Sequence, residues 1–185
     1  VGSEMCIRDS PYGSPSLEEL CAGKKDIVII SSDHTRPVPS RVTMPILLHH
    51  IHSAAPEARV RILVATGMHR PSTHEELVNK YGEEIVANEE IVMHVATDDS
   101  MMKKIGTLPS GGECIINKIA ADCDLLLAEG FIEPHFFAGF SGSRKSVLPG
   151  IASYKTIMYN HNGQFVNDSH SRAGNLCHNL SLIHI

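Results

Sequence analysis

The sequence contains no tryptophan, and aromatic residues make up only 5% of its 185 residues. Such a chain offers few platforms on which the bases of single-stranded nucleic acid could stack. The net charge of −5 and the lack of a long basic run also argue against nucleic acid as a partner. No apolar stretch approaches the roughly 18 residues of a membrane span, and no apolar signal-peptide core is evident. We therefore expect a cytoplasmic protein that binds neither nucleic acid nor membrane.

Cysteine chemistry is also poorly supported by the sequence. The five cysteines are odd in number and form no Cys-x-x-Cys pair, which argues against a disulfide framework or a zinc site. Histidine, in contrast, is abundant, with twelve residues. His49 and His52 have the i, i+3 spacing of two metal ligands on a helix, but no carboxylate is evident on that face. We interpret these two histidines as surface residues.

Two nucleotide-binding motifs are absent. The segment EPHFFAGFSGSRKSVLPG (Glu133–Gly150) looks at first like a phosphate-binding loop, but Arg144 precedes Lys145 where the Walker pattern requires glycine. No Gly-x-Gly-x-x-Gly follows the first predicted strand, where a dinucleotide-binding fingerprint would stand. An NAD-dependent oxidoreductase is therefore an alternative that the sequence disfavours.

Short apolar runs alternate with polar loops and helical patterns along most of the chain. The apolar runs predict buried strands at residues 26–31, 61–66, 91–96 and 124–128. Helical patterns cover residues 40–55, 72–81 and 112–122. This alternation predicts an α/β fold, with a Rossmann-like, mainly parallel sheet and flanking helices.

Local signals predict where two of these helices begin. Ser40 can cap the helix over residues 40–55. Ser72 and Thr73 start overlapping capping-box patterns with Glu75 and Glu76. The two ends of the chain continue none of these patterns. We expect residues 1–10 and 180–185 to be non-native segments that flank a domain over residues 11–179.

Three polar clusters each come shortly after a predicted strand. They are SDHTRP, GMHRPS and the long segment from Glu133 to Gly150. In open α/β sheets, ligands bind outside the carboxyl ends of the strands. The sequence therefore predicts that the three clusters converge on one face.

The residue types in these clusters leave several roles open. Arg36 offers a planar fork that suits carboxylate or phosphate, or it stands exposed beside a turn closed by Asp33. Lys145, next to Arg144, could bind an anion or act as a nucleophile with a lowered pKa. His161 could ligate a metal or cap a turn. The residues alone predict an anionic ligand site with two or three histidines.

The motifs SDHTRPVP, GMHRPST, EPHFFAGFSGSRKSVLPG and the histidine of YNHNG resemble the nickel-dependent lactate racemase family. Their order and spacing agree with its N-terminal domain across about residues 26–161. The resemblance implies a two-domain enzyme whose C-terminal domain closes over the site. We expect that domain to be missing from this chain. The chain would then keep the residues that anchor the cofactor but could be unable to turn over substrate, because an open site admits water and loses positioning.

The resemblance also implies a cofactor and the residues that hold it. In this family nickel is carried by pyridinium-3,5-bisthiocarboxylic acid mononucleotide, a pincer nucleotide joined to a lysine. By motif position, Lys145 is that lysine and reaches the metal only through its cofactor adduct, while His161 is the protein ligand of nickel. The implied catalytic residues are His69 and His135. The implied lining of the cofactor and substrate is formed by Asp33, His34, Thr35 and Arg36.

The implied reaction is racemisation or epimerisation of a small 2-hydroxy acid such as lactate. Hydride passes reversibly to the pyridinium ring while one of two histidines removes the hydroxyl proton, and its return to the other face inverts the carbon. The implied partners are this substrate and the enzymes that make the cofactor. The alternative from another class is a non-catalytic metal- or anion-binding module of the same fold.

One position departs from the family pattern. The family usually has two glycines before Arg-Lys, whereas Ser143 follows Gly142 in this sequence. If this backbone position requires a positive φ, serine is strained there and shifts Lys145.

Overall fold

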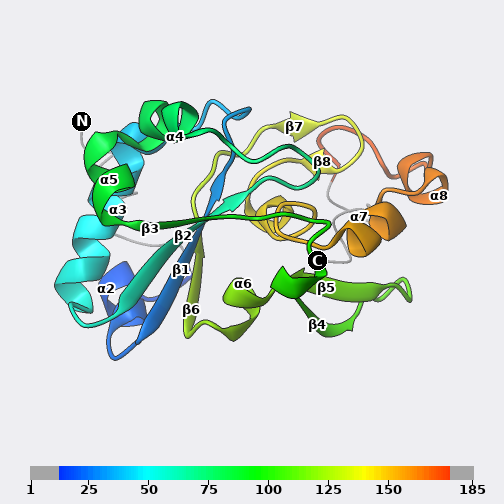
Figure 1. Ribbon diagram of the computed structural model, residues 1–185. Helices are drawn as coiled ribbons and strands as arrows, with labels where there is room; N and C mark the ends of the chain where they lie inside the picture. Colours follow the sequence, from blue (N-terminus) through cyan, green and yellow to red (C-terminus); the bar gives the residue numbers. More distant parts are fainter. Residues whose placement is uncertain (1–12, 176–185) are drawn as a thin grey trace.

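The computed structural model describes residues 13–175, and a four-stranded parallel sheet lies at its centre (Figure 1). The strand order is β3-β2-β1-β6. The strands are β1 (Asp26–Ser32), β2 (Arg59–Ala65), β3 (Glu90–Met93) and β6 (Leu125–Ala128). The expected α/β fold with a mainly parallel sheet is therefore confirmed, although β3 ends at Met93 rather than at Ala96.

The two central strands are apolar because both faces of the sheet are covered. The five inner residues of β1 and of β2 are all buried, as is typical of parallel strands between two layers. Successive side chains of a strand point to opposite faces. Ile27 and Ile29 belong to the core on one face, whereas Val28 and Ile30 pack with Ile151 on the other.

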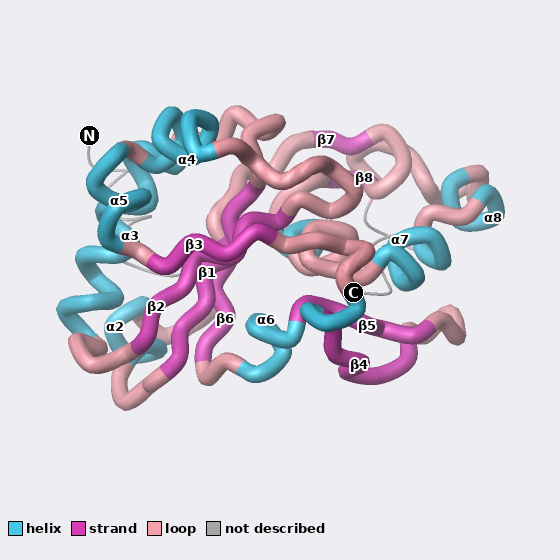
Figure 2. Tube along the Cα trace, viewed as in Figure 1, coloured by secondary structure: helices cyan, strands magenta, loops and turns pink. Residues whose placement is uncertain are grey.

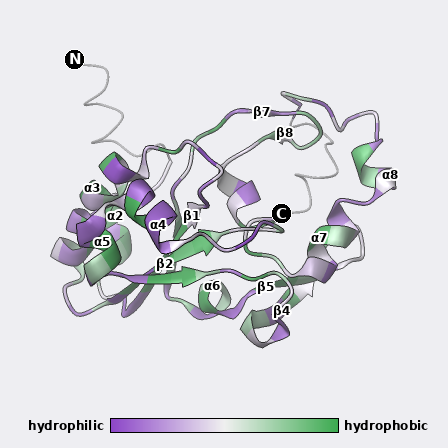
Figure 3. Ribbon diagram, turned by 45° about the horizontal axis from the view of Figure 1, so that its top comes forward, coloured by the Kyte–Doolittle hydropathy of each residue, from purple (hydrophilic) through white to green (hydrophobic). Residues whose placement is uncertain are grey.

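Helices cover one face of the sheet, and α6 together with the chain around Ile151 covers the other (Figure 2). The first layer consists of α2 (Leu17–Cys21), α3 (Ser40–Ala54), α4 (His74–Tyr81) and α5 (Glu83–Asn88). Figure 3 shows hydrophobic residues concentrated in the strands and hydrophilic residues on these helices. Within residues 13–175, no helix is both long and apolar enough to cross a membrane.

A smaller unit packs beside the sheet around a second cluster of apolar residues. It contains an antiparallel hairpin of β4 (Met102–Thr107) and β5 (Glu113–Asn117), followed by α6 (Lys118–Asp122). Beyond β6 the chain forms further short elements, which the sequence patterns did not predict. They are β7 (Pro134–His135), β8 (Gly139–Phe140), the 3-10 helix η2 (Ser143–Ser146), α7 (Tyr154–Asn160) and α8 (Gly163–Val166).

The helix predicted over residues 112–122 is wrong in its first half. Residues 113–117 form β5, which pairs with β4, and only the last five residues are helical. A short apolar run such as Cys114–Ile116 does not reveal by its periodicity whether it is helix or strand. Pairing with the neighbouring strand β4 decides that these residues form a strand. Lys104 Nζ of β4 also bonds Glu113 Oε1 of β5 at 2.7 Å.

The two predicted helix starts have different outcomes. Thr73 caps α4 through a capping box with Glu76, which confirms that prediction. Ser40 does not cap α3, because the cap position is Pro39 and no side chain bonds the first turn. The hydroxyl of Ser40 instead donates a hydrogen bond to Glu129 at 2.9 Å. The Ser40 hydroxyl, which the local pattern assigned to capping, thus bonds Glu129, a residue that is distant in the sequence and directly follows β6.

Several predictions fall outside the described residues. The segments 1–10 and 180–185, which the sequence marks as non-native, lie there, so that interpretation stays a prediction. The boundaries of the domain predicted over residues 11–179 lie there as well.

We predict that Gly150→Ala destabilises the chain by about 1–3 kcal/mol, the usual cost of overpacking. A Cβ at this position would clash with the Ser146 carbonyl and stand 3.0 Å from the Ala65 side chain. The free energy of unfolding from urea titrations measures the effect. Gly106→Ala is the matched control, because a Cβ there meets nothing within 4 Å. Equal losses in the two variants would contradict close packing at Gly150.

Candidate functional site

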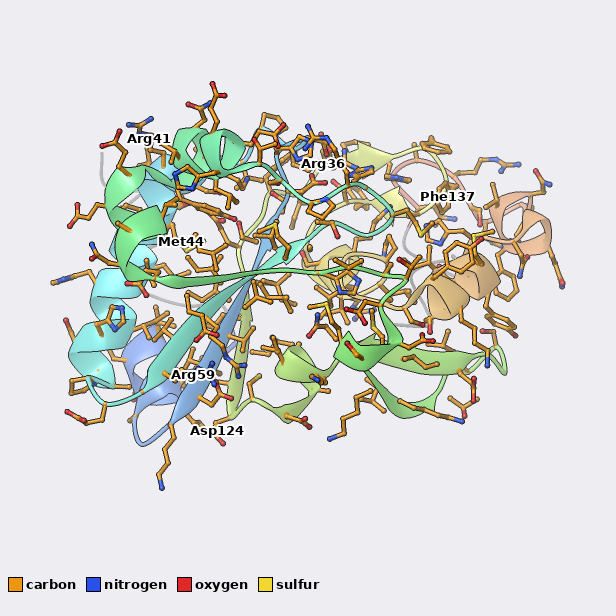
Figure 4. All side chains as sticks on the ribbon, in the orientation of Figure 1. Arg36, Arg41, Met44, Arg59, Asp124 and Phe137 are labelled. Atoms are coloured by element: carbon orange, nitrogen blue, oxygen red, sulfur yellow. The ribbon has the colours of Figure 1, made fainter. Side chains whose placement is uncertain are left out.

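The loops that follow β1, β2 and β6 surround one cavity of about 280 Å³. Its lining includes Asp33 and Arg36 from the first loop, His69 from the second, and Lys145 and His161 from the chain beyond β6. The predicted convergence of the three clusters is therefore observed. In Figure 4, Arg36 and Phe137 lie at this end of the sheet, whereas Arg59 and Asp124 lie at the opposite end.

Asp33 and His69 form a hydrogen-bonded pair at the floor of the cavity. The Asp33 Oδ2 atom lies 2.6 Å from His69 Nδ1, and the Asp33 side chain is 2% exposed while that of His69 is 50% exposed. Thr35 donates to the other carboxylate oxygen from both its backbone N–H and its hydroxyl. Burial acts to raise the pKa of Asp33, but the hydrogen bonds from Thr35 and His69 outweigh it and hold that pKa below its usual value. A carboxylate at Nδ1 orients the ring and leaves Nε2 as the nitrogen for a ligand.

His135 and Lys145 form a second pair, without a carboxylate. His135 Nε2 lies 2.9 Å from Lys145 Nζ, and His135 Nδ1 accepts a hydrogen bond from the backbone N–H of Ala138 at 3.2 Å. Burial, followed by the charges of Lys145 and Arg36, lowers the pKa of His135 to about 4. Burial and Arg36 lower the pKa of Lys145 to about 8. A lysine with such a pKa carries much more neutral, nucleophilic amine at pH 7 than an exposed one.

The aromatic ring of Phe137 lies among the functional groups of this second pair and His161. Its centroid is 4.8 Å from that of His135, 5.1 Å from that of His161 and 5.3 Å from Lys145 Nζ. Burial is the largest cause of the lowered pKa of all three groups.

His161 has the features of a metal ligand. It follows the last residue of α7 and lines the cavity, and its Nδ1 atom is buried without a hydrogen-bond partner among the described residues. Burial and the charge of Lys145 lower its pKa, which favours the neutral ring that binds metals. Within residues 13–175, no three His, Cys, Asp or Glu side chains come together as a metal site.

The remaining residues of the first cluster differ in where they lie. Arg36 lines the cavity and is 3.8 Å from Glu133 through a half-exposed pair, so its guanidinium is largely available. Thr35 donates its hydrogen bonds to Asp33. His34 is not among the lining residues, and its Nδ1 bonds the hydroxyl of Ser72 at 3.0 Å. Of the predicted site residues, His34, Thr35 and His135 are thus not among those that line the cavity, although Thr35 bonds Asp33 and His135 contacts Lys145.

The backbone resolves the question raised at Ser143. The positive φ of this turn, 81°, belongs to Gly142, where a Cβ would also clash with the Phe131 carbonyl. Ser143 begins η2, whose 3-10 conformation has a negative φ that any residue adopts. Serine at this position therefore brings no backbone strain to the turn that presents Lys145.

Sequence reasoning missed two residues near the site. Glu129 follows β6 directly, lines the cavity and accepts hydrogen bonds from the hydroxyls of Ser31, Ser40 and Thr43. His94 directly follows β3, is fully buried, and contacts the Ala152 carbonyl through Nε2 at 3.0 Å. Both stand at the carboxyl ends of strands, so the rule that located the three clusters could have found them.

The histidines of α3 were correctly interpreted as surface residues, but the reason given was wrong. His50 Nδ1 lies 2.6 Å from Glu18, and His52 Nε2 lies 3.0 Å from Glu89. The carboxylate of Glu89, which directly follows α5, therefore does lie against the face of His52.

Comparisons with known proteins show the family of this chain. A family model described as "Lactate racemase N-terminal domain" matches residues 7–174. Lactate racemases of Lactiplantibacillus plantarum and Thermoanaerobacterium thermosaccharolyticum are 74% and 54% identical over 171 residues. In both cases the match covers 92% of this chain, and the chain spans 40% of the length of these curated relatives.

Solved structures show the same relationship. The lactate racemase apoprotein from Thermoanaerobacterium thermosaccharolyticum is 52% identical, with a TM-score of 0.95 over 97% of this chain and 43% of that one. A protein from Thermotoga maritima is 22% identical, with a TM-score of 0.75 over 90% of this chain and 44% of that one. At this lower identity the second comparison shows the fold alone.

We predict that Asp33 makes the stability of the chain depend on acidity. The folded-state pKa of Asp33 lies below its unfolded value of about 3.9, so its contribution is present above that value and lost as pH falls through the folded pKa. Asp33→Asn should lower the free energy of unfolding at pH 7 and flatten its decline below about pH 4. Urea titrations at a series of pH values from 7 to below about 4 measure both. The exposed Asp122→Asn is the control, and parallel curves for Asp33→Asn and the unmodified chain would contradict the prediction.

We predict that acetylation of Lys145 reaches half of its maximal rate at about pH 8 and levels off above about pH 9. Because its pKa is lowered to about 8, the amine is half deprotonated at that pH and almost fully deprotonated about one pH unit higher, whereas a free lysine amide, with a pKa of about 10.4, continues to gain reactivity. Mass spectrometry of the Lys145 peptide after brief exposure to acetic anhydride gives the rate. Arg36→Gln removes a neighbouring positive charge and should move the curve to higher pH. A curve that follows the free amide would show that Lys145 is an ordinary lysine.

Proposed function

We propose a function from the premise that this chain belongs to the lactate racemase N-terminal domain family. In this proposal, the chain supplies the residues that anchor the cofactor and transfer protons in a racemase or epimerase of 2-hydroxy acids such as lactate. The chain spans 40% of the length of its curated relatives, so the activity, substrate and partners of the whole protein are part of this proposal. The observation that carries it is the gathering of His69, Lys145 and His161 around one cavity, with His135 Nε2 2.9 Å from Lys145 Nζ.

The cofactor in this proposal is pyridinium-3,5-bisthiocarboxylic acid mononucleotide with bound nickel. Lys145 is its covalent anchor, and His161 Nδ1, which is buried without a partner within residues 13–175, is the nitrogen available to nickel. When bound, this group supplies the hydride acceptor that the side chains of the protein lack. The enzymes that make the cofactor are the implied partners.

The two histidines hold the proton of the substrate hydroxyl. His69 is set up for this by Asp33, which bonds Nδ1 and stabilises the ring when Nε2 takes up a proton. His135 belongs to a different segment of the chain and contacts Lys145, which lines the cavity. Because two enantiomers direct their hydroxyl groups differently, a racemase needs a base for each, and these two segments provide them.

Arg36 binds the carboxylate of the substrate in this proposal. Its guanidinium lines the same cavity as His69 and Lys145, and its pairing with Glu133 is loose at 3.8 Å. A planar guanidinium binds a carboxylate through two parallel hydrogen bonds, which fixes the α-carbon relative to the bases.

The direct test is to produce the chain together with the cofactor-making enzymes and to measure its intact mass and nickel content. We expect a mass increase that maps to Lys145 and about one nickel ion per chain. His161→Ala should keep the adduct and lose nickel, because it removes a metal ligand but not the anchor. Lys145→Ala should lose both.

The catalytic assignments need a protein extended to the length of its relatives. In such a protein, His69→Ala should retain adduct and nickel while racemisation slows by about 10²–10⁴-fold, the usual contribution of one general base. An unmodified, nickel-free chain would favour the non-catalytic binding module. Nickel retained in full by His161→Ala would refute the role given to His161.

A further inference from the structure

The loop between β1 and α3 carries two groups of the proposed site but has little structure of its own. Residues 33–39 form neither helix nor strand, and only Asp33 among them is buried. Asp33, which bonds His69, and Arg36, which lines the cavity, both belong to this loop. A segment with so few buried contacts opens easily unless another part of the chain holds it.

One carboxylate, that of Glu129, bonds the chain at both ends of this loop. Ser31, at the end of β1, donates its hydroxyl to Glu129 Oε2 at 2.7 Å. Ser40, directly after the loop, donates to the same oxygen at 2.9 Å, and Thr43 of α3 donates to Oε1. Both serines are fully buried. The two flanks of the loop are therefore tied to one point.

Glu129 is itself fixed to the sheet. It directly follows β6, and its backbone N–H donates to the Ile30 carbonyl of β1 at 2.8 Å. A carboxylate offers about four lone-pair sites, and three hydroxyls of the chain occupy three of them. Although Glu129 lines the cavity, its oxygens are thus largely engaged by the protein, which suits a positioning group better than a base.

The sequence of the loop passes this anchoring on to Arg36. Two of the three residues between Arg36 and Ser40 are prolines, Pro37 and Pro39, whose rings fix φ. The N-terminus of α3 has no side-chain cap, because the Ser40 hydroxyl bonds Glu129 instead. The bond to Glu129 therefore sets where α3 begins, and the stiff chain before it sets where Arg36 lies.

We propose that Glu129 is a positioning residue: its carboxylate closes the loop of residues 33–39 at both ends, and this closure holds Asp33 against His69 and Arg36 in the lining of the cavity. What Arg36 and His69 do for a substrate rests on the proposed function, whereas the closure of the loop does not. Glu129 forms and breaks no covalent bond in this role.

Glu129→Ala tests the closure in the chain without cofactor. The backbone N–H of Thr35 donates to Asp33 Oδ1, and that of Arg36 donates to the Asp33 carbonyl, so hydrogen–deuterium exchange of these two amides measures opening of the loop. We expect their exchange, followed by NMR, to become about tenfold to hundredfold faster, the factor that corresponds to one hydrogen bond to a charged group. Unchanged rates would overturn the proposal.

Leu48→Ala separates opening of the loop from a general loss of stability. Leu48 is a buried core residue of the same helix α3, and its truncation destabilises the whole domain. This variant should speed up exchange in the core strand β2 and leave the Thr35 and Arg36 amides at their original rates. Loop amides that accelerate as much as in Glu129→Ala would assign the effect to stability and overturn the proposal.

Two milder variants grade the effect and keep the test available if Glu129→Ala does not fold. Glu129→Gln retains a carbonyl oxygen that accepts from both serines, so exchange should stay within about twofold of the unmodified chain. Ser40→Ala removes only the bond at the second end of the loop and should speed up exchange of the Arg36 amide about twofold to tenfold. A glutamine variant as fast as Glu129→Ala, or no change in Ser40→Ala, would contradict the closure.

A kinetic measurement, in a cofactor-loaded protein extended to the length of its relatives, distinguishes positioning from stability. Glu129→Ala should keep adduct and nickel while KM for the 2-hydroxy acid rises about tenfold, because Arg36 no longer meets the carboxylate in place, and Glu129→Gln should restore KM. A merely destabilised enzyme has less active protein but the same KM, so an unchanged KM would overturn the proposal. If the unmodified protein neither loads cofactor nor racemises, the proposed function fails, and the exchange rates still decide whether Glu129 closes the loop.

Discussion

The contact between the end of β2 and the turn at Gly150 is the constraint on which the site depends. The backbone N–H of Gly67 donates to the Gly150 carbonyl at 2.9 Å, and the Gly150 N–H donates to the Lys145 carbonyl. Gly150 approaches the Ser146 carbonyl so closely that no Cβ fits. This close approach joins the turn that carries Lys145 to the loop that carries His69, although the two residues are far apart in the sequence.

Two kinds of histidine stand around this junction, His69 in the lining of the cavity and His135 beside Lys145. His69 is paired through Nδ1 with the buried carboxylate of Asp33. Burial, followed by the charges of Lys145 and Arg36, lowers the pKa of His135 to about 4. The two rings therefore face groups of opposite charge.

The parts of the fold that were predicted correctly depend on local signals. The runs DIVIIS and RILVAT are apolar at every inner position, which only a strand covered on both faces requires. Thr73 and Glu76 are close in sequence and form their capping box without help from the rest of the chain. The failures lie where a distant partner decides. Residues 113–117 become a strand because β4 is beside them, and the Ser40 hydroxyl turns to Glu129.

The sequence by itself determined the parallel α/β architecture, the loops that carry the chemistry and the family to which they belong. These follow from alternating patterns and from motifs that are contiguous in the chain. Only the tertiary structure decided how the side chains of those loops are paired. It joined His69 to Asp33 and His135 to Lys145, left His161 Nδ1 without a partner among the described residues, and directed His34 to Ser72. The reason is physical: proton affinity and hydrogen-bond direction depend on burial and on neighbours from other strands, and these exist only once the sheet has formed.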